Sequence, residues 1–176
     1  DENSFFGFNT GQENTTGNFN SFFGSRAGHN NVTGSRNVFL GHTAGFSNFS
    51  GNDNVFIGEN AGNANVIGTA NVFIGNSTSS FNIDGKGNVF VGKNTGLSNI
   101  TESNNTFIGF LSNGVGGITN ATAIGSNAFV TTTNSMVLGS ILGQNLATAN
   151  TNVGIGLTAP ASTLHSAGQI RTGIPL

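Results

Sequence analysis

The sequence has little of the residue types that carry most protein chemistry. Cysteine, tryptophan and tyrosine are absent, and charged residues make up 7 % of the 176 residues, against roughly 25 % in an ordinary globular domain. The lack of cysteine excludes a disulfide framework and thiolate catalysis. The net charge of −2 gives no electrostatic basis for binding nucleic acid or an anionic membrane surface. We therefore expect no nucleic acid among the partners.

Long apolar runs are also missing. No run of 18 or more apolar residues occurs, so the sequence predicts no membrane-spanning helix and no direct membrane insertion. Low charge is typical of disordered chains, but 16 Phe residues at regular positions argue against disorder, because disordered chains are poor in aromatic residues. The chain opens directly in a repeat rather than in a signal peptide, and we expect it to be a piece of a longer protein.

Catalytic and metal-binding patterns are absent from the sequence. The histidines His29, His42 and His165 do not have the spacing of a metal site or of a catalytic triad. The acidic residues are dispersed, and the calcium-binding pattern G-G-x-G-x-D does not occur. We predict no catalytic residue, no metal site and no cofactor. An enzyme on a β-solenoid, such as a polysaccharide lyase, would lack its acid and base here.

What the sequence does contain is one pattern repeated at a fixed interval. The consensus N-V-F-I-G-x-x-A-G-x-x-N-x-x-G-x-x recurs every 17 residues, and a second Asn follows the first by eleven residues. The seven copies begin at Asn3, Asn20, Asn37, Asn54, Asn71, Asn88 and Asn105. A fixed period of this length is the signature of a solenoid in which each copy forms one coil.

Each coil is predicted to be β-structure. Val-Phe-Ile suits a short strand, and a Gly or Asn every few residues destroys any helical stripe. A second short apolar stretch follows the second Asn. Equivalent strands would stack at about 4.8 Å, and the two Asn columns would form hydrogen-bonded ladders at turns. The fold class is therefore predicted to be an all-β parallel solenoid.

The third position of the strand decides how the coils assemble. Side chains alternate faces in a strand, so we expect Val38 and Leu40 to fill the coil and Phe39 to point outward. The resulting outward column consists of Phe5, Phe22, Phe39, Phe56, Phe73, Phe90 and Phe107. Burying it offers on the order of 10–20 kcal/mol gross. A helix from elsewhere or further copies of the chain could cover it, and we prefer copies around a three-fold trimer axis.

The chain divides into three predicted regions. Residues 1–113 form the β-solenoid head of seven repeats. Residues 114–149 carry shorter repeats, because the spacing between pattern glycines changes after Gly109, and Ala123 and Val137 take the Phe position. Residues 150–176 are predicted to be a connector toward a stalk or the next fibre segment.

The shorter repeats resemble a known family. The segment NATAIGSNAFVTTTNSMVLGS, from Asn120 to Ser140, resembles the head repeat of trimeric autotransporter adhesins, and the 17-residue copies resemble a longer variant found in bacterial surface fibres and phage tail fibres. The segment from Asn150 to Gly173 is similar to connectors in such fibres. The resemblance implies a left-handed parallel β-roll, assembled as an intertwined or side-by-side homotrimer. Phe replaces the small residue of the usual head repeat in seven coils.

Variable loop positions are the candidates for ligand contact. Aromatic and basic residues on loops over a rigid scaffold suit a glycan or protein ligand, although the same residues could be solvent-tolerant filler or pack across a subunit boundary. They are Phe19, Arg26, His29, Arg36, His42, Phe46 and Phe81. We expect an extracellular or cell-surface trimeric adhesin head, or part of a phage tail fibre, that binds a surface glycan or protein of a target cell by multivalent contact. The alternative is a purely structural shaft segment.

Overall fold

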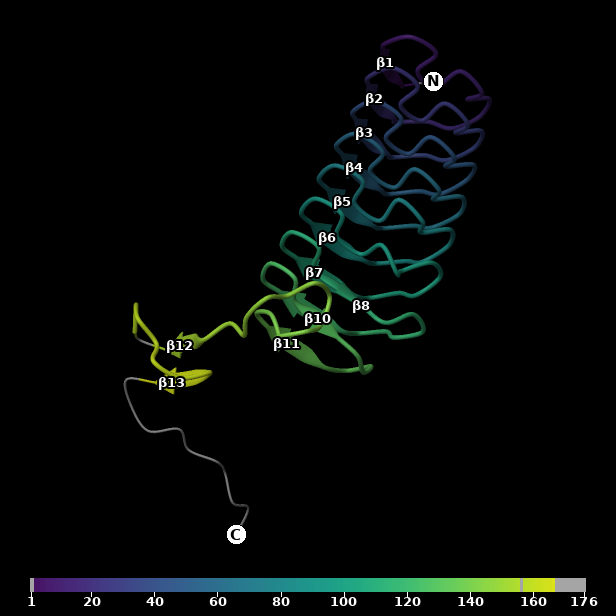
Figure 1. The fold of residues 1–176 in the computed structure, drawn as a ribbon. Coiled ribbons are helices and arrows are strands. Elements are labelled where there is room, and N and C mark those ends of the chain that lie inside the picture. Colours follow the sequence, from purple (N-terminus) through teal and green to yellow (C-terminus); the bar gives the residue numbers. More distant parts are fainter. Residues whose placement is uncertain (1, 156, 167–176) are drawn as a thin grey trace.

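The computed structural model describes residues 2–155 and 157–166, which form a parallel β-solenoid followed by a small separate strand pair (Figure 1). The described residues contain no helix, and hence none that could cross a membrane. The strands are β1 Ser4–Phe6, β2 Ser21–Phe23, β3 Val38–Leu40, β4 Val55–Ile57, β5 Val72–Ile74, β6 Val89–Val91, β7 Thr106–Ile108, β8 Asn113–Gly114, β9 Thr122–Ile124, β10 Phe129–Val130, β11 Met136–Leu138, β12 Val153–Ile155 and β13 Leu164–Ser166.

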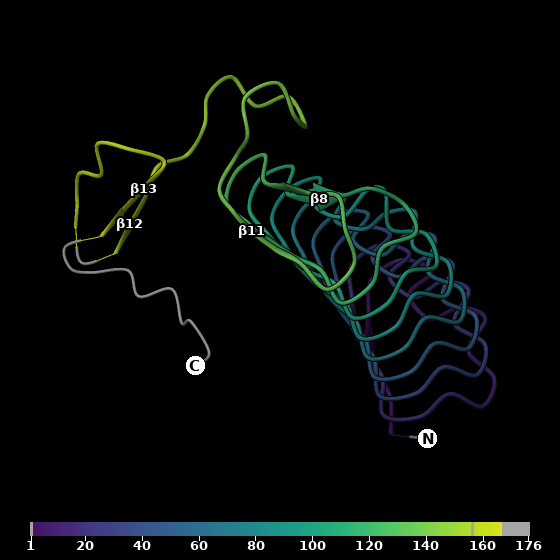
Figure 2. The same cartoon turned by 90° about the horizontal axis from the view of Figure 1, so that it is seen from below.

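One three-residue strand from each coil joins a single sheet. The nine strands follow the order β1 to β7, then β9 and β11, and every neighbouring pair is parallel. The register between β3 and β4 pairs Val38 with Val55, and Phe39 with Phe56. Figure 2 looks up the stack, in which the coils superpose with a gradual offset. The predicted parallel solenoid of 17-residue coils is therefore confirmed.

The Phe column lies inside the coil, and the prediction that it points outward is wrong. The rings of Phe22, Phe39, Phe56, Phe73, Phe90 and Phe107 are at most 1 % exposed within a single chain, while Phe5 in the first coil is 37 % exposed. Neighbouring rings stack face to face, with centroids 4.6–5.2 Å apart. These residues therefore cannot line a trimer axis.

The reason is the opposite wall of the coil, which is made of small residues. Ala44 is fully buried beside the Phe ladder, and a Cβ added at Gly45 would lie 2.5 Å from the ring of Phe39. One large side chain per coil fills the space that this wall leaves. The two flanking strand residues then face outward.

Two ladders of Asn side chains bind the coils together, as predicted. In the ladder of the second Asn, Nδ2 of Asn48 donates to Oδ1 of Asn31 at 2.7 Å and to the Gly51 carbonyl at 2.9 Å. In the ladder of the first Asn, Oδ1 of Asn37 accepts the backbone N–H of Asn54 at 3.0 Å. Most of these amides are fully buried, so each repeat supplies hydrogen-bond partners for polar groups of the neighbouring repeat that water cannot reach.

The coil narrows after β7. Ala123 pairs with Phe107, and Val137 pairs with Ala123, so smaller residues continue the Phe column, as the sequence indicates. A second contact between coils forms on another wall, where β8 pairs with β10. Ile118 and Val130 help to fill the core at this level.

The segment after β11 leaves the stack. Strands β12 and β13 pair in parallel with each other and stand away from the coils in Figure 1. The predicted connector, residues 150–176, lies partly outside the described residues, because residue 156 and residues 167–176 are not among them.

Candidate functional site

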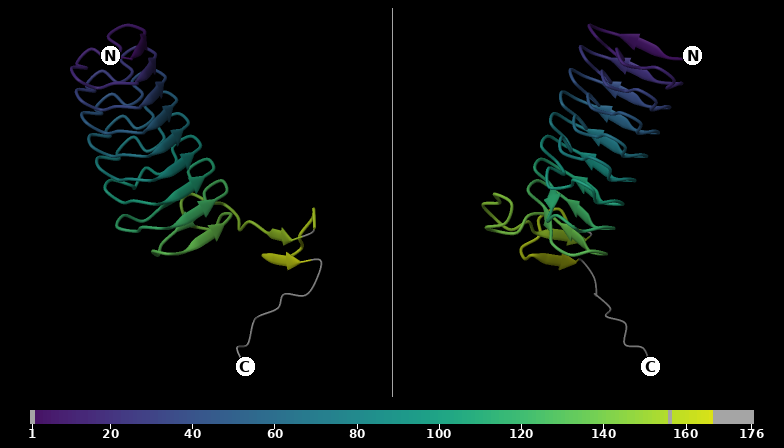
Figure 3. Two further views of the ribbon diagram at one scale, coloured as in Figure 1. Left: turned by 180° about the vertical axis from the view of Figure 1, so that it is seen from behind. Right: turned by 90° about the vertical axis from the view of Figure 1, so that its right-hand side faces the viewer.

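The sheet presents a largely apolar surface on its outer side, which we call the strand face. It consists of the first and third residues of the nine strands, namely Ser4 and Phe6, Ser21 and Phe23, Val38 and Leu40, Val55 and Ile57, Val72 and Ile74, Val89 and Val91, Thr106 and Ile108, Thr122 and Ile124, and Met136 and Leu138. Val38 is 40 % exposed and Leu40 is 47 % exposed, whereas the corresponding residues of β4, β5 and β6 are half-buried. None of these described positions carries a charge, and Figure 3 shows the strands aligned along one side.

A second apolar column, which we call the side stripe, runs along another wall. Its members follow the second Asn of five successive coils and are Val32, Phe49, Val66, Ile83 and Ile100. Phe49, Ile83 and Ile100 are about half exposed, and Val32 and Val66 are half-buried. Backbone hydrogen bonds hold the column in register, as from the Phe49 N–H to the Val66 carbonyl at 2.9 Å. The sequence signals this column as a second apolar stretch but does not reveal its exposure.

The corner between these two surfaces carries an ion pair. The Arg36 guanidinium donates to the Asp53 carboxylate at 2.6 Å and 2.9 Å. This hydrogen bond lowers the pKa of the Asp53 carboxyl and raises the pKa of Arg36. Both side chains are about half exposed, so water screens the pair and its contribution to stability is small.

The predicted ligand-contact residues do not form one patch. Phe19 and Arg36 stand one coil apart on the corner before the strand, whereas Arg26 and His42 lie in the turn after the strand. Phe81, 58 % exposed, belongs to a later coil.

One pair of these residues does meet. The rings of His29 and Phe46 stack with centroids 5.1 Å apart and an interplanar angle of 22°. Nδ1 of His29 is 2.7 Å from Oδ1 of Asn30. Since each ring covers a face of the other and both side chains are half-buried, this contact also serves to hold neighbouring coils together.

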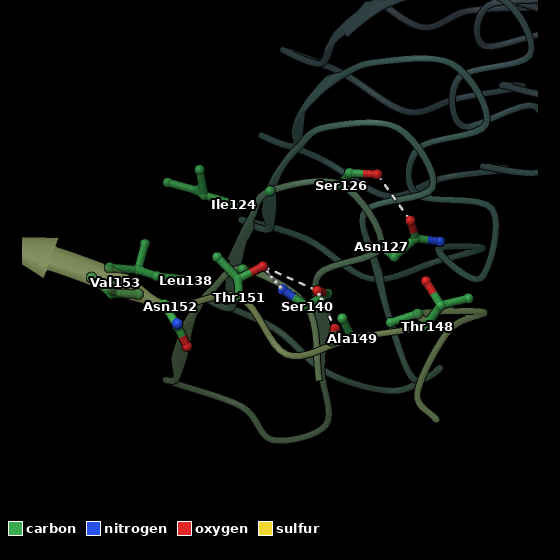
Figure 4. A pocket seen from close by; sticks show the side chains of 13 residues that line it. Ile124, Ser126, Asn127, Leu138, Ser140, Thr148, Ala149, Thr151, Asn152 and Val153 are labelled. Atoms are coloured by element: carbon green, nitrogen blue, oxygen red, sulfur yellow. Dashed lines mark hydrogen bonds between the residues drawn. The ribbon is translucent and has the colours of Figure 1, made fainter. Parts of the chain in front are cut away.

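An open pocket of about 510 Å³ lies where the chain leaves the solenoid (Figure 4). Ile124 and Leu138, at the end of the strand face, line one part of it, and Val153 lines another. The hydroxyls of Ser140 and Thr151 are 3.0 Å apart and bond to each other. None of the described residues that line the pocket is charged. The pocket therefore extends the strand face rather than forming a polar site.

The described residues contain no group of three His, Asp or Glu side chains that could hold a metal ion. Comparison with protein-family models, with curated proteins and with solved structures gives no match for this chain.

Proposed function

We propose that this chain is the head of an extracellular homotrimeric fibre or adhesin, a left-handed parallel β-roll that attaches to a glycan or protein on a target surface. The observation that carries the proposal is the strand face, an uncharged and mostly apolar surface that repeats once per coil over nine strands. Soluble monomers rarely leave an apolar surface of this kind uncovered. Self-association is the first part of the proposal.

The period of the strand face argues for a second copy as the partner. Its residues recur at the spacing of neighbouring strands, about 4.8 Å, along the whole stack. A partner can match every row only if its own surface has the same axial repeat. This chain has that repeat, because its strands pair in register from β1 to β7 and then from β7 to β9.

Attachment is the second part of the proposal. Three copies on a stiff rod would present each loop three times, so that weak contacts add through a high effective concentration. The turns tolerate variation, because the buried Phe and Asn ladders fix the backbone beneath them. The exposed members of the candidate set are the residues that we expect to contact a ligand, namely Phe19, Arg26, Arg36, His42 and Phe81.

A structural shaft is the second candidate function, and one observation favours it. The predicted contact residues are spread over separate corners and coils, with only His29 and Phe46 in ring contact. A shaft needs the rigid coil and the self-association but no ligand at these loops.

Light scattering at micromolar concentration tests the self-association, and a trimer is the expected result. A monomer would refute it. Binding to a glycan array and to target-cell envelopes then separates the two functions, with an Arg26→Ala/Phe81→Ala variant as the control for loop contact. Binding that the variant loses supports the adhesin. An intact trimer that binds neither the glycan array nor the target-cell envelopes supports the structural shaft.

A further inference from the structure

The chain has two exposed apolar surfaces, and a single self-association through one of them would leave the other uncovered. The strand face and the side stripe lie on different walls of the same coil, separated by the corner that carries Arg36 and Asp53. We propose that neighbouring copies associate heterologously, with the strand face of one copy packed against the side stripe of the next. This inference rests on the proposed self-association and specifies its geometry.

The size of the strand face supports the use of both surfaces. Nine strands of three residues give a face of about 40 Å by 10 Å, or roughly 400 Å², from the strand spacing and the rise per residue. A stable protein interface buries about 800 Å² on each partner. The strand face alone supplies about half of that area. A copy that uses its strand face toward one neighbour and its side stripe toward the other is held by two such interfaces, so the area buried per copy is the sum of both surfaces.

The two surfaces also match each other in pattern. Over the five coils that the side stripe spans, both carry one row per coil, and both follow the same axial repeat, because backbone hydrogen bonds hold the strands and the side stripe in register. Val66 of the side stripe belongs to the same coil as Val55 and Ile57 of the strand face. In a closed ring, a rotation relates the copies, so these residues would stand at about the same height.

Charge is arranged as this contact requires. The strand face is uncharged, and no member of the side stripe is charged. Arg36 and Asp53 lie between the two surfaces and neutralise each other, and Asp84, Lys86 and Glu102 lie in the same part of later coils. An apolar centre with a polar margin is the usual anatomy of a protein interface. Heterologous contacts of this kind form a ring when the rotation closes.

Disulfide cross-linking tests the geometry, because the chain has no cysteine of its own. The test variant is Ile57→Cys/Val66→Cys, compared with Ile57→Cys alone and Val66→Cys alone. Of the two outward residues of β4, Ile57 lies farther from the Arg36 corner than Val55 does. In the proposed ring, neighbouring copies meet at that corner, so the Ile57 side chains of two copies would not lie close together. The double variant Ile57→Cys/Phe81→Cys is the matched control. Phe81 is exposed to solvent but belongs to neither the strand face nor the side stripe.

The expected result is a shift of the test variant from one chain to covalent dimers and trimers on a non-reducing denaturing gel, with the single variants and the control remaining at one chain. Cross-linking of Ile57→Cys alone would overturn the proposal, because it requires strand face against strand face. An oligomer in which the test variant does not cross-link would also overturn it. A monomer in light scattering would instead overturn the self-association itself, which keeps the two failures distinct.

Discussion

The ring of Phe39 lies flat on the ring of Phe56, with centroids 4.9 Å apart and an interplanar angle of 8°. The same contact recurs along the ladder, so each ring fills its own coil and supports the coils above and below. Stacked aromatic pairs contribute about 0.5–1.5 kcal/mol beyond the burial of their area. The ladder is therefore both the core of each coil and a link between coils.

Phe56→Ala is expected to destabilise the fold of the single chain by about 3–5 kcal/mol, because it empties the coil and removes two ring contacts. The free energy of unfolding from urea denaturation measures the loss. Phe81→Ala removes a ring that is 58 % exposed and should cost less than about 1 kcal/mol. Equal losses in the two variants would contradict the buried ladder.

Asn48→Ala is expected to lower the free energy of unfolding by about 3 kcal/mol or more. The change removes several buried hydrogen bonds at once, and each buried polar group left unpaired costs about 1–3 kcal/mol. The Asn48 amide donates to Asn31 and Gly51 and accepts from Asn65. The matched control is Asn76→Ala, whose amide makes an exposed hydrogen bond with Glu59. The urea midpoint should fall well below that of the control, and a midpoint equal to it would show that the ladder adds nothing.

Ser79→Gly is expected to stabilise the chain by about 1 kcal/mol. Ser79 occupies the position that Gly62 holds one coil earlier, its φ is +47°, and its buried hydroxyl has no hydrogen-bond partner. A non-glycine residue in this left-handed region costs about 1–2 kcal/mol. The ring spacing between Phe73 and Phe90, 5.2 Å, is also the widest in the ladder.

The reverse change, Gly62→Ser, is the control for that prediction. A Cβ at Gly62 would lie 2.6 Å from the Phe56 ring, so we expect a loss of stability of about 1–3 kcal/mol. Thermal unfolding of both variants measures the effects. Shifts of the melting temperature in the same direction would contradict this reading of the position.

Glu102 is expected to make stability depend on acid pH. Partial burial by itself raises the pKa of the Glu102 carboxyl, but hydrogen bonds from the N–H groups of Gly117, Ile100 and Thr101 together outweigh it and lower the pKa below its usual value. A lowered folded-state pKa gives stability that is present above the unfolded value of about 4.3 and is lost as the pH falls through the folded-state value.

Glu102→Gln should therefore reduce the difference in melting temperature between pH 6 and the acid range below about pH 4. Glu13→Gln, a change at an exposed acid, is the control. A pH dependence that is the same in Glu102→Gln as in the parent chain would contradict the role of this carboxylate at the point where the coil length changes.

The sequence predicts the fold well because the same strand-and-turn pattern occurs in seven successive copies. The period places each strand in register with the next, and the buried Asn ladders follow from amides at equivalent positions. The continuation of the Phe column by Ala123 and Val137 could also be read directly. Each of these features depends only on spacing along the chain.

Spacing along the chain could not predict whether the Phe39 side chain points into the coil or out of it. Alternation in a strand shows that Val38 and Leu40 share a face, but it does not show which face is inside. That choice depends on the opposite wall, where Ala44 and Gly45 leave room for a ring. The spread of the candidate contacts has a similar cause, since sequence neighbours at different positions of a coil project from different walls.

The strict register of the ladders also sets the steps in which this rod can change length. Removing one whole 17-residue copy would join β3 to β5 with Phe under Phe and Asn under Asn, and would shorten the stack by about 4.8 Å. Removing a single residue would shift the later coils out of both columns at once. The lengths open to this part of the chain are therefore whole numbers of coils, each added or lost without disturbing its neighbours.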